Sequence, residues 1–244
     1  MKLKPIIFVF AFLSCRFAGY AQPVFNSQIK ISSAYSVMNF DTTGINPGNA
    51  GENVIWDFSK QASLNTSSTV KFMPADSCPG SKNFPKADIA LPTGSDRYIF
   101  YDTASGWSKV GQYYNEKVAT VITYSDFQKL GKGPYKYKYH FSDDFLGKYT
   151  GPKGNAERIG KYSKTIDGYG TLITPAGTFK NVLRVRVTEN IQDEFTTGGL
   201  KISTDVIMYQ WIAEGFSYPL MTIYESRIKN SSGNYTFIYR NANY

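Results

Sequence analysis

The stretch from Asp167 to Glu189 constrains the fold of this chain more than any other. It reads DGYGTLITPAGTFKNVLRVRVTE, two runs of strand-forming residues with a Pro-x-Gly break between them. In the second run, 182–188, apolar and polar residues alternate, and successive side chains of a strand point to opposite faces. Proline fixes its own φ and glycine accepts φ > 0, so residues 174–177 favour a tight turn. The stretch therefore predicts an antiparallel hairpin with half-buried arms.

Short runs of aromatic and β-branched residues recur along the rest of the chain. Tyr and Phe number 19 and 17, and Gly, Pro, Asn, Asp or Ser interrupt the runs. This spacing predicts an all-β fold, an antiparallel β-sandwich or a strongly curved, partly open barrel, of about 11 to 13 strands with little helix. Besides the hairpin arms, the predicted strands are 24–31, 54–58, 68–73, 97–102, 107–113, 117–124, 135–141, 156–166, 201–212, 218–228 and 235–240. One helical turn is predicted at Ser125–Leu130, from capping-box spacing and a following glycine.

The first 21 residues have the pattern of a secretory signal peptide. Lys2 and Lys4 precede an apolar run at 6–13, and Gly19-Tyr20-Ala21 supplies small residues for cleavage. The run is shorter than a spanning helix requires. Cleavage after Ala21 removes three basic residues, so the formal charge falls from +8 to +5. The alternative is a lipoprotein, because Leu13-Ser14-Cys15 resembles a lipid attachment site.

The remaining chain, 22–244, is predicted to form a single all-β domain. The stretches 39–51 and 76–94 are rich in Gly, Pro, Asn and Ser, and we expect loops there. The second stretch is a candidate boundary between a small N-terminal half and a larger C-terminal one, but the half before it holds too few apolar runs for a core of its own. A chain of this length can bury about 70% of its unfolded surface in one domain. No later run is long enough to span a membrane.

Several motifs resemble a pattern found in secreted proteins of Bacteroidota. They are GYGTL, TPAGTF and NVLRVRV in the hairpin, and GENVIWDFS, ITYSDF and WIAEGFSYPLMTIYES elsewhere. Many such proteins carry a C-terminal type IX secretion sorting domain after a β-rich region of similar size. The sequence up to Tyr244 contains no segment that resembles this sorting domain. The resemblance implies an extracytoplasmic location and no particular activity, since each motif is a packing or turn motif.

The composition argues against several classes of function. Zinc and other transition metals need clustered ligands, whereas the chain has one histidine, His140, and keeps one cysteine, Cys78, after the expected cleavage. Cys78 lies in a turn-rich segment and has little support as a nucleophile. The basic residues are scattered and accompany no recognition motif, so nucleic acid is not a predicted partner. No cofactor is predicted.

Asp143 and Asp144 are weak candidates for a calcium site. Calcium binds through oxygen ligands, and both residues lie in the segment FSDDF, where we expect a turn, with Asp126 as a further candidate. The chain has no Asp-x-Asp-x-Asp-Gly loop. Solvated turn carboxylates are the alternative interpretation.

Aromatic residues supply the candidate ligand-binding positions. The segment 133–141 places Tyr135, Tyr137 and Tyr139 on one face of a predicted strand and its lysines on the other. Such a face is a platform for a sugar ring or an apolar ligand, or else it fills the core while the lysines protect a sheet edge. Trp107 follows a predicted turn at 103–106, from which its indole can project, and is the best single candidate.

Three functions are consistent with these features. The first is a secreted, periplasmic or cell-surface protein without catalytic activity that binds a glycan or another envelope component. The second is a carboxylate-dependent glycan hydrolase or lyase, which needs an acidic pair in an aromatic cleft. The third is a carrier of an apolar ligand, with a cavity lined by residues such as Tyr137, Tyr209 and Phe237. The sequence favours the first, because no catalytic constellation is recognisable, and it predicts no oligomeric state.

Overall fold

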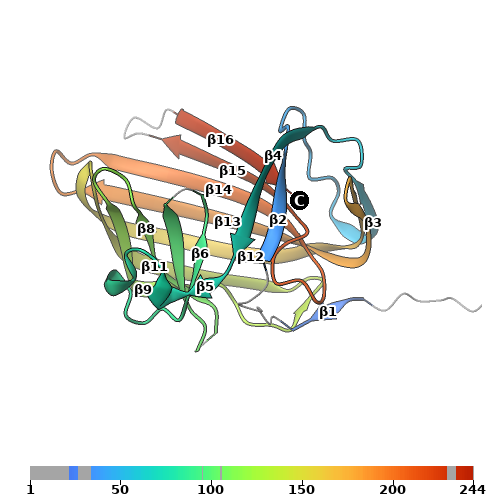
Figure 1. Cartoon of the computed structure of the whole chain (residues 1–244), viewed down its shortest axis with the longest axis horizontal. Coiled ribbons are helices and arrows are strands. Elements are labelled where there is room, and N and C mark those ends of the chain that lie inside the picture. The colour runs from blue at the N-terminus through green and yellow to red at the C-terminus, as the bar shows by residue number, and fades with distance from the viewer. Residues whose placement is uncertain (1–21, 27–33, 95, 105, 230–234, 244) are drawn as a thin grey trace, which may run out of the picture.

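The chain is built almost entirely from β-strands (Figure 1). The computed structural model describes residues 22–26, 34–94, 96–104, 106–229 and 235–243. Within them, the only helical elements are two short 3-10 turns, η1 (Ala75–Ser77) and η2 (Ser81–Asn83). The all-β prediction is therefore confirmed. The predicted signal peptide, including Cys15, lies outside the described residues.

Sixteen strands are present in the described residues. The first eight are β1 (Val24–Phe25), β2 (Ala34–Phe40), β3 (Gly51–Asp57), β4 (Ser63–Lys71), β5 (Met73–Pro74), β6 (Ile89–Pro92), β7 (Arg97–Asp102) and β8 (Ser108–Tyr114). The other eight are β9 (Thr120–Lys129), β10 (Tyr135–Lys136), β11 (His140–Gly151), β12 (Gly154–Thr174), β13 (Gly177–Phe195), β14 (Lys201–Ile212), β15 (Met221–Lys229) and β16 (Tyr235–Asn243).

Fourteen of these strands belong to one sheet. Its order is β4-β2-β16-β15-β14-β13-β12-β11-β9-β8-β7-β6-β5, and β3 adds to β12 beside this path. Neighbours along the path are antiparallel. The short strands β1 and β10 form a separate antiparallel pair. No helix of the described residues has both the length and the apolar character needed to cross a bilayer.

The two ends of the sheet are consecutive in the chain. Strand β4 stands at one end of the order and β5 at the other, and Phe72 alone separates them in sequence. The sheet must therefore curve until its ends approach, and Figure 1 shows β4 crossing in front of the long central strands. No strand pairing joins β4 to β5 in the described part of the chain. The result is a curved open sheet that is not closed into a barrel.

The longest strands form the predicted hairpin. Strands β12 and β13 pair from Ala156 with Phe195 to Thr174 with Gly177, so Pro175 and Ala176 make the turn. Gly177 has φ 145°, which L-residues with a side chain rarely adopt. The hairpin prediction is confirmed, and the predicted strand at 156–166 continues directly into its first arm.

Strand β3 packs beside the end of β12, and the two form the one parallel pair among the described strands. It runs alongside residues 168–173, beyond the part of β12 that pairs with β11. The contact is close at Gly170, where a Cβ atom would lie 1.9 Å from the carbonyl oxygen of Val54. Only glycine fits at this position, because any side chain would overlap the backbone of β3.

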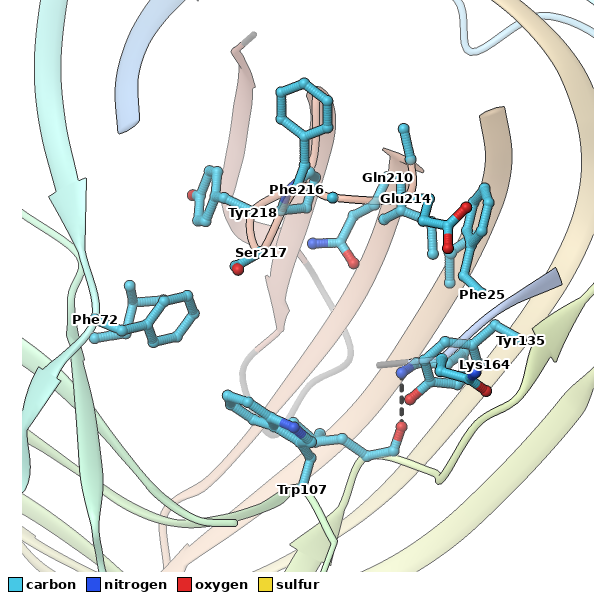
Figure 2. Close-up of a pocket in the computed structure, with 18 of the residues that line it drawn as sticks. Phe25, Phe72, Trp107, Tyr135, Lys164, Gln210, Glu214, Phe216, Ser217 and Tyr218 are labelled. Atoms are coloured by element: carbon cyan, nitrogen blue, oxygen red, sulfur yellow. Dashed lines mark hydrogen bonds between the residues drawn. The ribbon is translucent and has the colours of Figure 1, made fainter. Parts of the chain in front are cut away.

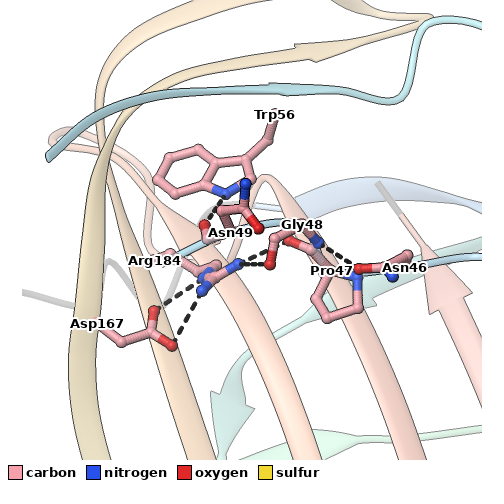
Figure 3. A network of polar contacts seen from close by, with 7 residues as sticks. All are labelled: Asn46, Pro47, Gly48, Asn49, Trp56, Asp167 and Arg184. Atoms are coloured by element: carbon pink, nitrogen blue, oxygen red, sulfur yellow. Dashed lines mark hydrogen bonds and ion pairs between the residues drawn. The ribbon is translucent and has the colours of Figure 1, made fainter. Parts of the chain in front are cut away.

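The segment before β3 is held by a buried arginine (Figure 3). Arg184 is 2% exposed and pairs with Asp167, while its Nη1 donates hydrogen bonds to the carbonyl oxygens of Pro47 and Gly48. Its guanidinium also lies 5.5 Å from the ring of Trp56. A hairpin with half-buried arms would leave Arg184 in solvent. Here the segment 46–49 covers the face of the hairpin on which Arg184 lies.

Hydrophobic clusters lie on both faces of the sheet. Inside the curve, Tyr162, Ile166, Val185 and Val187 belong to the largest cluster. Outside it, the segment with η1 and η2 packs Phe84 against Phe100 with ring centroids 4.4 Å apart, and buries Cys78. Burial raises the pKa of the Cys78 thiol, which disfavours the nucleophilic thiolate form.

Several local predictions were wrong. The predicted helical turn at Ser125–Leu130 is strand as far as Lys129, because β9 pairs there with β8 and β11, with a bulge at Ser125. The predicted loop 76–94 contains β6 and both 3-10 turns, and strand β2 was missed. The predicted strand 24–31 is observed as strand only at Val24–Phe25, and 27–31 lie outside the described residues.

The predicted strand 135–141 is also wrong. A turn at Tyr137 and Lys138 interrupts it, and Lys138 has φ 68°. The backbone N–H of Lys138 donates instead to the carbonyl of Ile166. Tyr135, Tyr137 and Tyr139 therefore do not form one face of a strand.

Candidate ligand-binding cavity

A cavity of about 550 Å³ lies inside the curve of the sheet (Figure 2). Its described lining comes from segments far apart in sequence, which include β1, β6, β7, β12, β13 and β14. Phe72, the residue between the two ends of the sheet, contributes to the wall. The approach of β4 and β5 is therefore what brings both ends of the sheet to the same cavity.

Aromatic side chains form one wall of this cavity. The Trp107 ring packs edge-on against Phe72, with centroids 5.9 Å apart, and against Tyr101 at 5.5 Å. Burial raises the pKa of Tyr101 to about 12, so its hydroxyl is neutral at physiological pH. The wall thus presents an uncharged surface to a ligand.

The connection 213–219 between β14 and β15 forms the opposite wall (Figure 2). The backbone N–H of Ser217 donates to the Tyr35 hydroxyl at 2.9 Å, and Tyr218 stacks on Tyr35 with centroids 6.0 Å apart. Phe216 packs edge-on against Phe179 at 6.2 Å. These contacts fix the connection against β2 and β13.

Lys164 brings a cation to an otherwise mostly apolar lining. On β12, Tyr162, Lys164 and Ile166 share the inner face of the sheet, because side chains two residues apart point the same way. The Lys164 Nζ donates a hydrogen bond of 2.6 Å to the Leu130 carbonyl and lies 4.9 Å from the Tyr135 ring centroid. Removal from water disfavours the charged form and lowers the pKa of Lys164 to about 8.

Lys109, unlike the partly buried Lys164, is a fully buried lysine of the same interior. Lys109 is 8% exposed and lies 5.8 Å from the Tyr124 ring centroid. Glu189 is held nearby by a 2.7 Å hydrogen bond from the Gln128 amide. Burial alone would lower the pKa of Lys109, but Tyr124 and Glu189 raise it above its usual value. Lys109 is therefore a compensated charge, unlike Lys164.

Trp107 and Tyr135, two of the predicted ligand-binding residues, line the cavity. Tyr135 also donates its hydroxyl to the Gly131 carbonyl at 3.0 Å. Tyr137 packs instead on Tyr169, at 5.5 Å between centroids, and Tyr139 packs on Tyr135 at 5.2 Å. A role in ligand binding stays a prediction for all four.

The residues suggested for an apolar cavity are placed differently from expectation. Neither Tyr137 nor Tyr209 is among the residues that line the cavity. The Tyr209 ring lies 5.3 Å from the guanidinium of Arg184. The side chain of Phe237 lies outside the described part of the structure.

The calcium candidates Asp143 and Asp144 lie within strand β11, not in a turn. As neighbours in a strand they point to opposite faces. Asp143 accepts a 2.7 Å hydrogen bond from the backbone of Lys129, and Asp144 lies 4.0 Å from the ammonium of Lys161. Among the described residues, no group of three or more potential metal ligands is present.

The sequence did not identify Phe72, Tyr101 and Lys164 as residues that line a ligand cavity. The pattern Tyr162-x-Lys164-x-Ile166 contains a usable signal, because it places an ammonium on an otherwise apolar strand face. Phe72 carried no such signal, since its role depends on where the two sheet ends meet.

The chain was also compared with protein-family models, curated proteins and solved structures, and nothing in the three comparisons matched. The fold and the cavity define the class of protein: an all-β chain with a curved open sheet around a half-open, partly aromatic cavity.

Proposed function

We propose that this protein binds a small, largely apolar molecule in the half-open cavity on the inner side of its curved sheet. The observation that carries the proposal is the cavity itself, with its volume of about 550 Å³ and its wall of Phe72, Tyr101 and Trp107. Small-molecule sites are typically clefts or cavities of about 300 to 1,000 Å³ with apolar and aromatic walls and few polar groups. The third function considered from the sequence is thus the one with most support.

The same lining gives less support to the other two functions. Glycoside hydrolysis uses a pair of carboxylates, and Glu214 is the one carboxylate among the described residues of the wall. A glycan platform made of Tyr135, Tyr137 and Tyr139 loses its basis, because a turn interrupts the segment. With the predicted signal peptide, the proposal describes a secreted, periplasmic or cell-surface carrier.

Titration with N-phenyl-1-naphthylamine tests the proposal. This neutral aromatic probe fluoresces when it leaves water, and we expect saturable binding of one probe per chain. Ala213→Trp places an indole in the lining and should weaken binding at least tenfold. Ile159→Trp is the matched control, because Ile159 is 51% exposed on β12, and it should bind as the unmodified chain does.

Thermal melts of both variants show whether each one is folded. The proposal is overturned if the unmodified chain does not bind the probe saturably. It is equally overturned if folded Ala213→Trp and Ile159→Trp bind the probe alike, because the site then lies elsewhere.

A further inference from the structure

We propose that the cavity selects molecules carrying a single carboxylate on an apolar body, and that the Lys164 ammonium binds this carboxylate. The inference rests on the proposed function, since it concerns the same cavity. It adds the chemical class of the ligand and the residue that recognises it.

The position of the Lys164 ammonium supports this assignment. The Lys164 ammonium donates one hydrogen bond, of 2.6 Å, to the Leu130 carbonyl, and it lies 4.9 Å from the centroid of the Tyr135 ring. An ammonium has three N–H donors, and Leu130 is the sole hydrogen-bond acceptor for Lys164 in the described structure. Donors therefore remain for an acceptor inside the cavity that Lys164 lines.

The cations that are fully buried in the described structure each have a carboxylate nearby, whereas Lys164 is partly buried. Arg158 makes two hydrogen bonds of 2.7 Å to Asp193, Arg184 pairs with Asp167, and Lys109 has Glu189 close enough to raise its pKa. Lys164 forms no ion pair with a described carboxylate, and desolvation is the only cause of its lowered pKa. A charge held in an apolar site without a counter-ion is costly, and a bound anion would supply that counter-ion.

The lining favours a monovalent anion. Lys164 is the one Lys, Arg or His among the described residues of the wall, and Glu214 adds a negative charge to it. A phosphate monoester carries up to two charges, and its sites commonly combine several cations or helix N-termini. A carboxylate needs a single ammonium, and the aromatic wall suits the apolar remainder of the molecule.

A matched pair of ligands, decanoate and 1-decanol, tests the inference by calorimetric titration at pH 7. They share a ten-carbon chain and differ in the charged group. We expect the unmodified chain to bind decanoate at least tenfold more tightly than decanol. Lys164→Met and Lys164→Gln should abolish this preference by weakening decanoate binding alone. Lys161→Met removes an exposed ammonium of the same strand and should keep the preference.

The outcomes separate this inference from the proposed function. Equal binding of decanoate and decanol by the unmodified chain, or a preference that survives both Lys164 variants, overturns the inference and leaves the cavity as an apolar site. Tighter binding of monodecyl phosphate than of decanoate overturns the carboxylate assignment. Failure of the chain to bind N-phenyl-1-naphthylamine and both ligands overturns the proposed function as well.

Discussion

Arg184 and Asp167 form a two-pronged ion pair across the β12–β13 hairpin, with 2.8 Å between Nε and Oδ1 and 3.1 Å between Nη2 and Oδ2. Asp167 is the extra residue of a bulge in β12, where the pairing shifts between Ile166 and Gly168. The bulge presents the carboxylate to the arginine of the other arm. Because Arg184 also binds the carbonyls of Pro47 and Gly48, the pair fastens the segment before β3 to the sheet.

Arg184→Met should destabilise the protein by about 3 to 5 kcal/mol, the range typical of a buried ion pair that loses one partner. The change leaves Asp167 and two backbone carbonyls without their donor. Urea unfolding at pH 7 measures the loss. Arg186→Met is the control, because Arg186 is exposed on the same strand, and it should change stability by less than about 0.5 kcal/mol. Equal stability of the two variants would show that the pair is not a structural anchor.

Lys164→Met should be more stable than the unmodified chain at pH 7, by up to about 3 kcal/mol at 1.36 kcal/mol per pKa unit. Folding lowers the Lys164 pKa from 10.5 to about 8, so the native state has to hold a poorly solvated ammonium below pH 8. As pH rises from 8 to 10.5, the native lysine loses its proton first, and the unmodified chain recovers this stability. The lost hydrogen bond to Leu130 reduces the gain.

Urea unfolding of both proteins at pH 7 and pH 10 gives the measurement. Other groups, including the tyrosines, titrate alike in the two proteins, so the difference isolates Lys164. A stability difference that stays constant between the two pH values would contradict the assigned environment of this lysine.

Lys109→Met should have the opposite effect and destabilise the protein at pH 7, by about 3 kcal/mol. Removal of this ammonium leaves Glu189, whose charge helps to raise the pKa of Lys109, without this nearby cation. Thermal melts of the Lys109→Met and Lys164→Met variants provide the comparison. A gain in stability on loss of Lys109 would mean that its charge is not compensated as the structure indicates.

Gly170→Ala should destabilise the protein by about 1 to 3 kcal/mol, because the new methyl group would overlap the Val54 carbonyl of β3. Hydrogen exchange should show faster exchange in β3, Gly51–Asp57, with smaller changes in β14. Thr171→Ala, at the next position of β12, is the control and should leave exchange in β3 unchanged. Unaltered exchange in β3 of the Gly170 variant would rule out the close approach.

The hairpin and the strands 97–102 and 201–212 were predictable, because alternation and turn residues are local properties. The segments Ser125–Leu130 and 135–141 were not. Ser125 has a capping signal that loses to pairing with strands on both sides. The turn at Lys138 follows from its hydrogen bond to Ile166, which a local pattern does not reveal.

The candidate site was predictable only in part. Trp107 and Tyr135 stood out as aromatic residues in unusual contexts, and both line the cavity. Phe72 lies between the two end strands β4 and β5, whereas Lys164 lies on the central strand β12, and only the curvature of the sheet brings them to one cavity.

The sequence by itself determined that this chain forms β-strands and where its central hairpin turns. Only the tertiary structure decided which strand faces line a cavity, and that Lys164 lies there without an ion pair to any described carboxylate. The reason is physical: alternation depends on neighbours in the chain, whereas register, bulges and curvature depend on pairing between distant strands.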